Sequence, residues 1–247
     1  MKPKLKAILF DMGGTLIEFE NSSWEVLNQH CAKQGYDFLK KQKLIDIDYQ
    51  NYVEYLRKEF EEMWVSYNKI LKEINFESMV FSLFKKLNLN LTDDNKKKFM
   101  NIYYQPITEQ LTLIPGAVET LSFFKNKRLK VGLLSNTIFP KRFHSEELKR
   151  FGLLRYLDVA VFSSDVGFKK PHPLIFQTAL QILDTDPEFA AFVGDRMEED
   201  IQGAHRLGMK TILKINKKKE SSGNIYPDAE INNLTELPGA IIKLFDF

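Results

Sequence analysis

The chain of 247 residues is poor in cysteine and histidine, residue types that build disulfide frameworks and many metal sites. A single cysteine, Cys31, excludes an intrachain disulfide framework and a cysteine-rich metal site. The four histidines are dispersed, and none pairs with another at the spacing of metal ligands. We therefore expect a protein of a reducing compartment in which Cys31 is a buried helix thiol.

Long apolar runs and a strong net charge are also missing. The apolar run Ala7–Phe10 is too short for the core of a signal peptide, and no run approaches the roughly 18 residues of a membrane span. The net charge is only +2, so no global field favours nucleic acid or a membrane surface. We expect a cytoplasmic protein that binds neither, with Lys217–Lys219 in a solvated loop. No residue pattern indicates an oligomeric state.

Residues 22–110 show helical periodicity and contain both tryptophans. Apolar residues at spacings of three and four form one stripe, made of Val53, Leu56, Phe60, Met63, Trp64 and Tyr67. Similar patterns predict further helices over 23–35, 76–88 and 94–105. The segment is therefore expected to be a helical insert. Aromatic stripes usually form a core, so contact of Trp24 or Trp64 with a substrate is the less common alternative.

Strands and helices alternate through the remainder of the chain. The predicted strands cover 7–10, 130–134, 158–163, 190–194 and 210–215, and the predicted helices cover 117–126, 142–151, 172–183 and 198–207. This alternation implies right-handed crossovers and a mostly parallel sheet, which is an α/β fold. Asp11, Ser135 and Asp195 each follow the end of a predicted strand, where ligands of such sheets bind.

Four short motifs occur in order along the chain. They are Asp11-Met12-Gly13-Gly14-Thr15, Ser135-Asn136-Thr137, Gly167-Phe168-Lys169-Lys170-Pro171, and Val193-Gly194-Asp195 followed by Asp200. Together they resemble the signatures of the haloacid dehalogenase-like (HAD) hydrolase superfamily. The resemblance implies a Rossmann-like, doubly wound, mostly parallel core with an inserted α-helical cap of the first-insertion class. We place the discontinuous core at residues 1–16 and 112–247 and the cap at 17–111.

Asp11 is the candidate nucleophile. A carboxylate can form a covalent aspartyl-phosphate, which divides a difficult displacement into two steps. The glycine-rich turn after it, with Gly14 and Thr15, offers backbone N–H groups to a bound phosphate. The alternative role for Asp11 is that of an ordinary turn cap.

Two further motifs supply candidate phosphate contacts. Ser135 and Asn136 follow a strand end, where a hydroxyl and an amide can hold phosphate oxygens without adding charge. Lys170 resembles the family lysine that neutralises the nucleophile and the phosphate. Lys169 is the adjacent competitor, and the spacing to the following proline favours Lys170.

Magnesium is the expected cofactor. It prefers a few carboxylates together with water and phosphate oxygens. Asp11, Asp195 and the backbone carbonyl of Gly13 would form such a set. Asp200 is either a further ligand or partner of the site, or an acid favoured in the first turn of a helix.

Gly13 occupies the position at which the family signature, Asp-x-Asp-Gly-Thr, has a second aspartate. In phosphatases of the family this acid protonates the leaving oxygen and later activates water, help that is typically worth about 10²–10⁴-fold. Without this acid, hydrolysis of phosphate esters with poor leaving groups should slow most. Hydrolysis of acyl and aryl phosphates should be affected less. Glu18, Glu20 and His144 are candidate substitutes.

The sequence predicts a magnesium-dependent hydrolase of a small phosphorylated metabolite. Two alternatives stay open because Gly13 is also compatible with them. One is dehalogenase-like or phosphonatase-like chemistry, the latter using a cap lysine for which Lys33, Lys40, Lys41 and Lys43 are candidates. The other is a phosphate-binding protein with little turnover.

Overall fold

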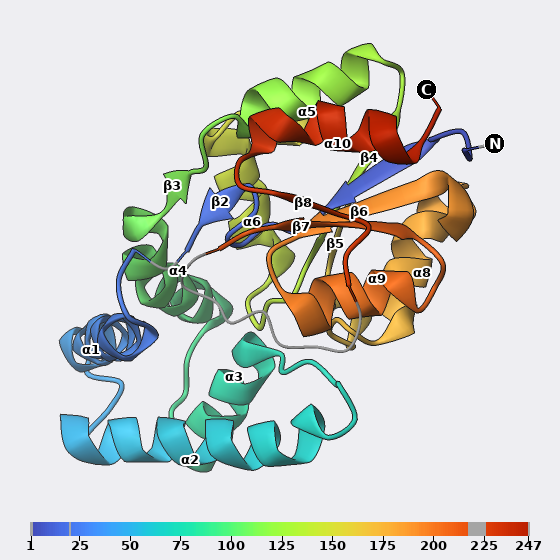
Figure 1. The fold of residues 1–247 in the computed structure, drawn as a ribbon. Coiled ribbons are helices and arrows are strands. Elements are labelled where there is room, and N and C mark those ends of the chain that lie inside the picture. Colours follow the sequence, from blue (N-terminus) through green and yellow to red (C-terminus); the bar gives the residue numbers. More distant parts are fainter. Residues whose placement is uncertain (1, 20, 217–225, 247) are drawn as a thin grey trace.

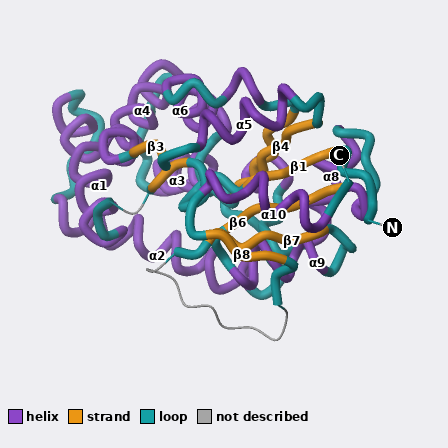
Figure 2. Tube along the Cα trace, turned by 45° about the horizontal axis from the view of Figure 1, so that its top comes forward, coloured by secondary structure: helices purple, strands orange, loops and turns teal. Residues whose placement is uncertain are grey.

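A computed structural model of the chain describes residues 2–19, 21–216 and 226–246 (Figure 1). Its centre is a six-stranded sheet in which every pairing is parallel (Figure 2). In spatial order the strands are β5 (Val159–Phe162), β4 (Lys130–Ser135), β1 (Ala7–Phe10), β6 (Ala190–Gly194), β7 (Lys210–Lys214) and β8 (Ala229–Ile231). The predicted α/β class with a mostly parallel sheet is confirmed.

Helices cover both faces of this sheet. They are α5 (Ala117–Asn126), α6 (Lys141–Arg150), α7 (Ser163–Val166), α8 (Pro173–Ile182), α9 (Gly203–His205) and α10 (Leu237–Leu244). Helices α5 and α10 lie over one face and α8 and α9 over the other (Figure 1). Strand β1 is buried along its whole length, with Ile8 and Phe10 packed towards α5 and Ala7 and Leu9 towards α8. This two-sided burial explains why the strand is an unbroken apolar run.

The chain leaves the sheet through β2 (Ile17–Glu18) and returns through β3 (Thr112–Leu113), which pair antiparallel. Between them lie α1 (Trp24–Lys41), α2 (Tyr49–Asn68), α3 (Phe76–Lys86) and α4 (Asp93–Gln110), grouped beside the sheet in Figure 1. Each of the four helices begins at a capping side chain that accepts a backbone N–H bond: Ser23, Asp48, Asn75 and Thr92. We refer to these four helices, residues 24–110, as the cap and to the remainder as the core; the division into a core at 1–16 and 112–247 and a cap at 17–111 stays a prediction.

The cap contacts the core near the carboxyl ends of the strands. The loop between α2 and α3 pairs with the loop before α8: Glu73 donates its N–H to the Gly167 carbonyl, and Lys169 donates its N–H to the Leu71 carbonyl, both at 2.9 Å. The buried Glu73 carboxylate also accepts a 2.6 Å hydrogen bond from the Ser163 hydroxyl. These bonds fix the cap against the strand ends.

The 198–207 segment differs from the single helix expected there. It forms a π-helical stretch, Met197–Gln202, followed by the short α9. The Arg196 carbonyl accepts both the Asp200 and the Ile201 N–H, at 3.0 and 3.2 Å, which widens this turn. Strands β2, β3 and β8 and helix α10 were not predicted.

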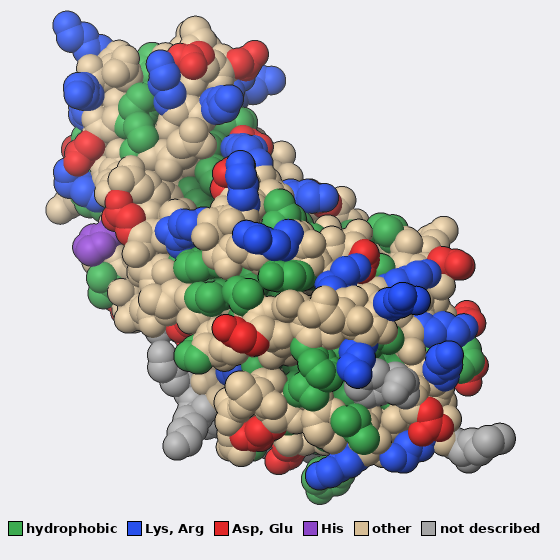
Figure 3. Space-filling model, turned by 90° about the horizontal axis from the view of Figure 1, so that it is seen from above, with side chains coloured by type: hydrophobic (Ala, Val, Ile, Leu, Met, Phe, Trp, Pro, Cys, Tyr) green, Lys and Arg blue, Asp and Glu red, His purple; other side chains and the backbone are tan. Residues whose placement is uncertain are grey.

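Two observations bear on the surface and on membranes. Basic and acidic side chains are interspersed over the face seen in Figure 3. No helix among the described residues is long and apolar enough to cross a bilayer. The lysine run 217–219 and Glu20 lie outside the described residues.

Packing within the cap generates a stability prediction. Helices α1 and α4 approach closely at Gly35, where an added methyl group would lie 2.8 Å from the buried ring of Phe99. Gly35→Ala should therefore destabilise the protein by about 1–3 kcal/mol despite its better helix propensity. Gly239→Ala is the matched control, because nothing lies within 4 Å of its added methyl group; it should stabilise by about 0.5–1 kcal/mol. Urea denaturation checks both, and a Gly35→Ala protein as stable as the control would contradict the packing.

Candidate active site

Asp11 lies at the carboxyl end of β1, in the middle of the sheet. Its backbone N–H donates to the Val193 carbonyl at 2.8 Å and so continues the pairing with β6. Gly14 follows in the left-handed region, at φ 79°, and turns the chain back so that its N–H meets the Ile17 carbonyl at 2.8 Å. The Asp11 carboxylate is only 6% exposed, and one of its oxygens, Oδ2, accepts a bond from the Thr15 hydroxyl at 3.3 Å.

Lys170 is the cation of this site. Its ammonium donates to Asp11 Oδ1 at 2.7 Å, to Asp200 Oδ1 at 2.6 Å and to the Leu134 carbonyl at 3.2 Å, and the residue is 1% exposed. Lys169 points elsewhere: its ammonium lies 2.7 Å from Asn68 Oδ1 on the cap. The structure therefore brings Lys170, and not its neighbour, against Asp11.

Burial and charge set the protonation of these groups. Burial raises the pKa of Asp11 to about 6; Lys170 opposes this, and the Asp200 and Asp195 carboxylates add to it. Burial by itself lowers the pKa of Lys170, but Asp11 and Asp200 more than reverse this, so its pKa lies above the usual value. Burial raises the pKa of Asp200 as well. Near neutral pH the lysine is charged and most Asp11 side chains are ionised.

Asn136 holds the backbone of Lys170. Its side-chain amide donates to the Lys170 carbonyl at 3.0 Å, and its side-chain oxygen accepts the Lys170 N–H at 2.7 Å. Ser135, at the end of β4, is buried and its hydroxyl contacts the Asn136 carbonyl at 3.5 Å. The amide predicted to hold phosphate is thus engaged in orienting the lysine, whereas the Ser135 hydroxyl lies at the strand end beside the cavity described below.

Asp195 and Asp200 lie at the end of β6. The Asp200 carboxylate is fully buried; its Oδ2 accepts the backbone N–H groups of Asp195 and Arg196 at 3.1 and 3.0 Å, and its Oδ1 faces Lys170. Any side chain at Gly194 would collide with this carboxylate. Asp195 Oδ2 accepts a 2.9 Å bond from Asn216, two residues past the end of β7.

The carboxylates of Asp11, Asp195 and Asp200 form a cluster whose oxygens lie within 4.8 Å of one another. Buried carboxylate oxygens this close together are the donors that a magnesium ion takes. Asp200 is fully buried and its oxygens accept three hydrogen bonds at 2.6–3.1 Å, whereas Asp11 and Asp195 are 6% and 4% exposed, so these two are the better placed ligands. The donor set therefore fits Mg²⁺, with Asp200 orienting Lys170 and the Asp195 backbone.

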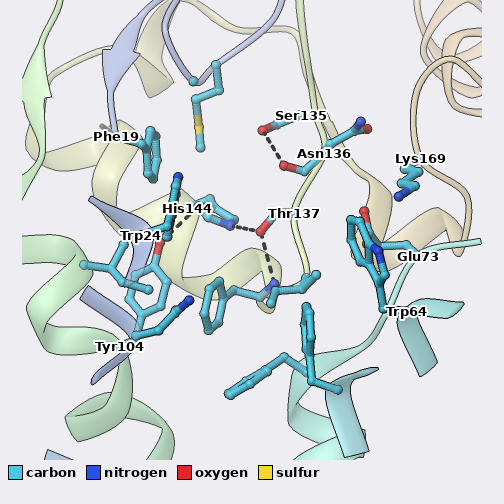
Figure 4. Close-up of a pocket in the computed structure, with 18 of the residues that line it drawn as sticks. Phe19, Trp24, Trp64, Glu73, Tyr104, Ser135, Asn136, Thr137, His144 and Lys169 are labelled. Carbon is cyan, nitrogen blue, oxygen red and sulfur yellow. Dashed lines mark hydrogen bonds between the residues drawn. The ribbon is translucent and has the colours of Figure 1, made fainter. Parts of the chain in front are cut away.

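A cavity of about 840 Å³ extends from Asp11, Gly13, Gly14 and Ser135 to the cap helices. Figure 4 shows Ser135, Asn136 and Thr137 in succession beside it, with Phe19, Trp24 and Tyr104 on one side and Trp64 on another. The α2 stripe predicted from the sequence lines this cavity through Val53, Leu56, Phe60 and Trp64. The stripe therefore faces the cavity and does not form only a core.

A buried polar network closes one side of the cavity. His144 contacts the Thr137 hydroxyl through Nε2 at 2.6 Å (Figure 4). Its Nδ1 contacts the Glu147 carboxylate at 2.9 Å. Tyr104, on cap helix α4, donates to the same Glu147 carboxylate at 2.6 Å. The network joins the cap to α6 of the core. Nothing in the local sequence pattern signalled it, since its members come from three separate segments.

Sequence comparison decides the family. The sequence profile of the haloacid dehalogenase-like hydrolases matches residues 5–208 of this chain. The chain is a haloacid dehalogenase-like hydrolase. It is similar to a glyceraldehyde 3-phosphate phosphatase of Methanocaldococcus jannaschii, with 27% identity over 242 residues that cover 97% of this chain and 98% of that protein.

Solved structures agree with this membership. A HAD phosphatase from Thermococcus onnurineus matches with a TM-score of 0.66 at 27% identity, covering 98% of this chain and all of the other. A 2-haloacid dehalogenase from Pseudomonas syringae matches with a TM-score of 0.72 at 24% identity over 97% of this chain and 99% of the other. The second likeness concerns the fold alone.

The candidate lysines of a phosphonatase-like HAD site lie away from the cavity. Lys33 pairs with Asp37, and Lys40 donates to the Asp46 carbonyl. None of the four candidate lysines lines the cavity, including Lys41 and Lys43. The cavity is lined by both described candidates for replacing the missing acid, Glu18 and His144.

The two adjacent lysines of this HAD hydrolase allow a matched test of the ion network. Lys170→Met should lower the free energy of unfolding by about 3–5 kcal/mol, because it leaves the Asp11 and Asp200 carboxylates buried without their cation. Lys169→Met removes a contact to Asn68 and an ammonium 4.4 Å above the Trp64 ring, and should cost about 1 kcal/mol or less.

Urea denaturation at pH 8, above the raised pKa of Asp11, measures both. Equal losses from the two variants would contradict the assignment of Lys170 as the cation of the site; failure of Lys170→Met alone to fold would agree with it.

Proposed function

We propose that this HAD hydrolase is a magnesium-dependent phosphatase that acts on a small phosphorylated metabolite through an aspartyl-phosphate at Asp11. The observation that carries the proposal is the placement of the Asp11 carboxylate. It is buried at a strand end, fixed by Lys170 at 2.7 Å, and opens onto a cavity within 4.8 Å of the Asp195 carboxylate. The phosphatase names of the similar proteins support the same reaction class.

The first step follows from the geometry of Asp11. Lys170 donates to Oδ1, and within the described residues the one hydrogen bond to Oδ2 is the 3.3 Å bond from the Thr15 hydroxyl. Oδ2 is therefore the oxygen that forms the bond to phosphorus as the ester P–O bond breaks, and the alcohol leaves into the cavity with a proton taken from solvent. The ammonium of Lys170 offsets the negative charge of the incoming phosphoryl group, and the Ser135 hydroxyl and the Thr15 backbone N–H hold its oxygens. The Gly14 N–H, also predicted for this role, is donated to the Ile17 carbonyl instead.

The second step returns the enzyme to its starting state. Water attacks the phosphorus of the aspartyl-phosphate, the bond to Asp11 breaks, and inorganic phosphate leaves as a proton passes to solvent. Asp200 holds Lys170 in place during both steps, and Asn136 fixes the backbone of the same lysine.

Asp11, Asp195 and the Gly13 carbonyl would hold the metal. A bound Mg²⁺ would polarise the phosphoryl oxygens and offset their charge. The cytoplasmic location of the protein stays a prediction.

Carbon-directed chemistry is the weaker alternative. A dehalogenase-like reaction needs no metal, whereas this site gathers three buried carboxylates. A phosphonatase-like reaction needs a lysine at the substrate, and the four candidate lysines of the cap do not line the cavity. A phosphate-binding protein with little turnover would retain the phosphoryl group on Asp11.

Phosphate release from acetyl phosphate tests the proposal, because its acidic leaving group needs no proton from the enzyme. Release should require Mg²⁺, stop in EDTA and resume when Mg²⁺ is restored in excess. Asp11→Asn should reduce it by about 10⁴–10⁶-fold, the loss typical of removing a nucleophile. Asp94→Asn, a change at an exposed cap position, should leave the rate unchanged.

Three results would count against the proposal. Undiminished phosphate release in EDTA would show that the reaction does not need a metal. Undiminished release by Asp11→Asn would show that Asp11 is not the nucleophile. A single round of phosphate uptake without release would favour the binding protein.

A further inference from the structure

The missing acid and the lining of the cavity point to the same kind of substrate. At Gly13 a side chain has room, since an added Cβ would meet only a ring carbon of Phe19, at an ordinary 3.6 Å. No carboxyl is present there to protonate a leaving oxygen. Two described candidates for replacing it line the cavity: His144, whose ring nitrogens are both engaged, by Thr137 and Glu147, and Glu18, which lies on β2 and not at the Gly13 position beside Asp11.

A site without this acid favours an acidic leaving group. An aliphatic alcohol is about as weak an acid as water, whereas a phenol such as the tyrosine side chain is far more acidic and ionises with a pKa near 10. The alkoxide must take a proton as it leaves, but a phenolate can depart without one. Without a general acid, the rate of hydrolysis should therefore drop by about 10²–10⁴-fold for alkyl phosphates and by much less for aryl phosphates.

The cavity favours an apolar ring. Its lining includes Phe19, Trp24, Phe60, Trp64, Phe76 and Phe139. Trp24 and Trp64 are 41% and 45% exposed and both line this cavity. Trp64 stacks on Phe60 at an interplanar angle of 18°, and the Lys169 ammonium lies 4.4 Å from the centre of its ring. Aromatic rings of this kind pack favourably against another ring.

The charged cap residues that line the cavity already have partners, whereas Asn28 and Gln29 add uncharged amides to the lining. Of the charged lining residues within 24–110, Arg57 binds Glu61 at 2.7 Å, and Glu73 accepts bonds from Ser163 and from its neighbouring backbone N–H. A three-carbon sugar phosphate would leave most of the 840 Å³ unfilled and its hydroxyl groups beside aromatic carbon.

We propose that the substrate is an aryl-type monophosphate, the phosphate ester of an apolar ring-bearing hydroxyl of phenol acidity. This inference rests on the proposed phosphatase function. Asp11 forms the bond to phosphorus, the bond to the ring oxygen breaks, and the phenolate leaves into the cavity and takes its proton from solvent. Water then releases phosphate from Asp11.

The experiment compares four substrates with Mg²⁺ present: phenyl phosphate, cyclohexyl phosphate, glyceraldehyde 3-phosphate and acetyl phosphate. Phenyl and cyclohexyl phosphate have apolar six-membered rings and differ in leaving-group acidity. We expect kcat for phenyl phosphate to exceed kcat for cyclohexyl phosphate by about 10²–10⁴-fold. We expect kcat/KM for glyceraldehyde 3-phosphate to lie below that for phenyl phosphate by at least about tenfold.

Variants separate the effect of acidity from that of the ring. Gly13→Asp should raise kcat for cyclohexyl phosphate at least about tenfold and leave kcat for phenyl phosphate nearly unchanged. The ratio of the two kcat values should therefore fall. Trp64→Ala should raise KM for phenyl phosphate about tenfold without changing KM for acetyl phosphate. Tyr226→Ala is the matched control, because this exposed ring lies outside the cavity lining, and it should change neither.

Acetyl phosphate distinguishes the two possible failures. If its release depends on Asp11 but cyclohexyl or glyceraldehyde 3-phosphate reacts as well as phenyl phosphate, the aryl proposal is wrong and the phosphatase stands. If its release does not depend on Asp11, both proposals fall. A KM for phenyl phosphate that Trp64→Ala leaves unchanged would also overturn the aryl proposal.

Discussion

The ion pair network of Lys170 with Asp11 and Asp200 is the interaction on which the site depends. All three groups are buried, and the ammonium lies 2.7 and 2.6 Å from the two carboxylates. Buried charges of this kind are stable only when each is satisfied, and here each member has further partners: Thr15 for Asp11, and two backbone N–H groups for Asp200. Because the lysine is fixed on both sides, the reactive carboxylate has one orientation towards the cavity.

The fold makes this network possible by bringing strand ends together. Strand β1 lies between β4 and β6, so that Asp11, Ser135 and Asp195 emerge from three adjacent parallel strands at one edge. The cap then covers this edge through the loop between α2 and α3 and through Tyr104. In the proposed mechanism the reacting residues lie at the sheet edge, whereas the aromatic residues proposed to select the substrate lie mostly in the cap. The two sets come from different parts of the chain.

Sequence patterns predicted the core of this arrangement for a clear physical reason. Buried parallel strands are unbroken apolar runs, and residues after their ends must share an edge, so the convergence of Asp11 and Asp195 followed from local patterns. The same reasoning could have found Asn216, which follows β7. The π-helical turn at Asp200 and the engagement of Asn136 by Lys170 depend on contacts between segments far apart in the chain. Strands of two residues, β2 and β3, are too short to show a period, and an apolar helical stripe does not reveal whether it faces a core or a cavity.

The most direct test of the central claim is to look for the phosphoryl group on Asp11 itself. Enzyme mixed with acetyl phosphate and Mg²⁺ is quenched in acid within one turnover, and the peptide that contains residues 7–16 is analysed by mass spectrometry. The account predicts a phosphoryl group on Asp11 that hydroxylamine removes and that is absent when Mg²⁺ is chelated. Continued phosphate release with no phosphoryl group on this peptide at any quench time would contradict it.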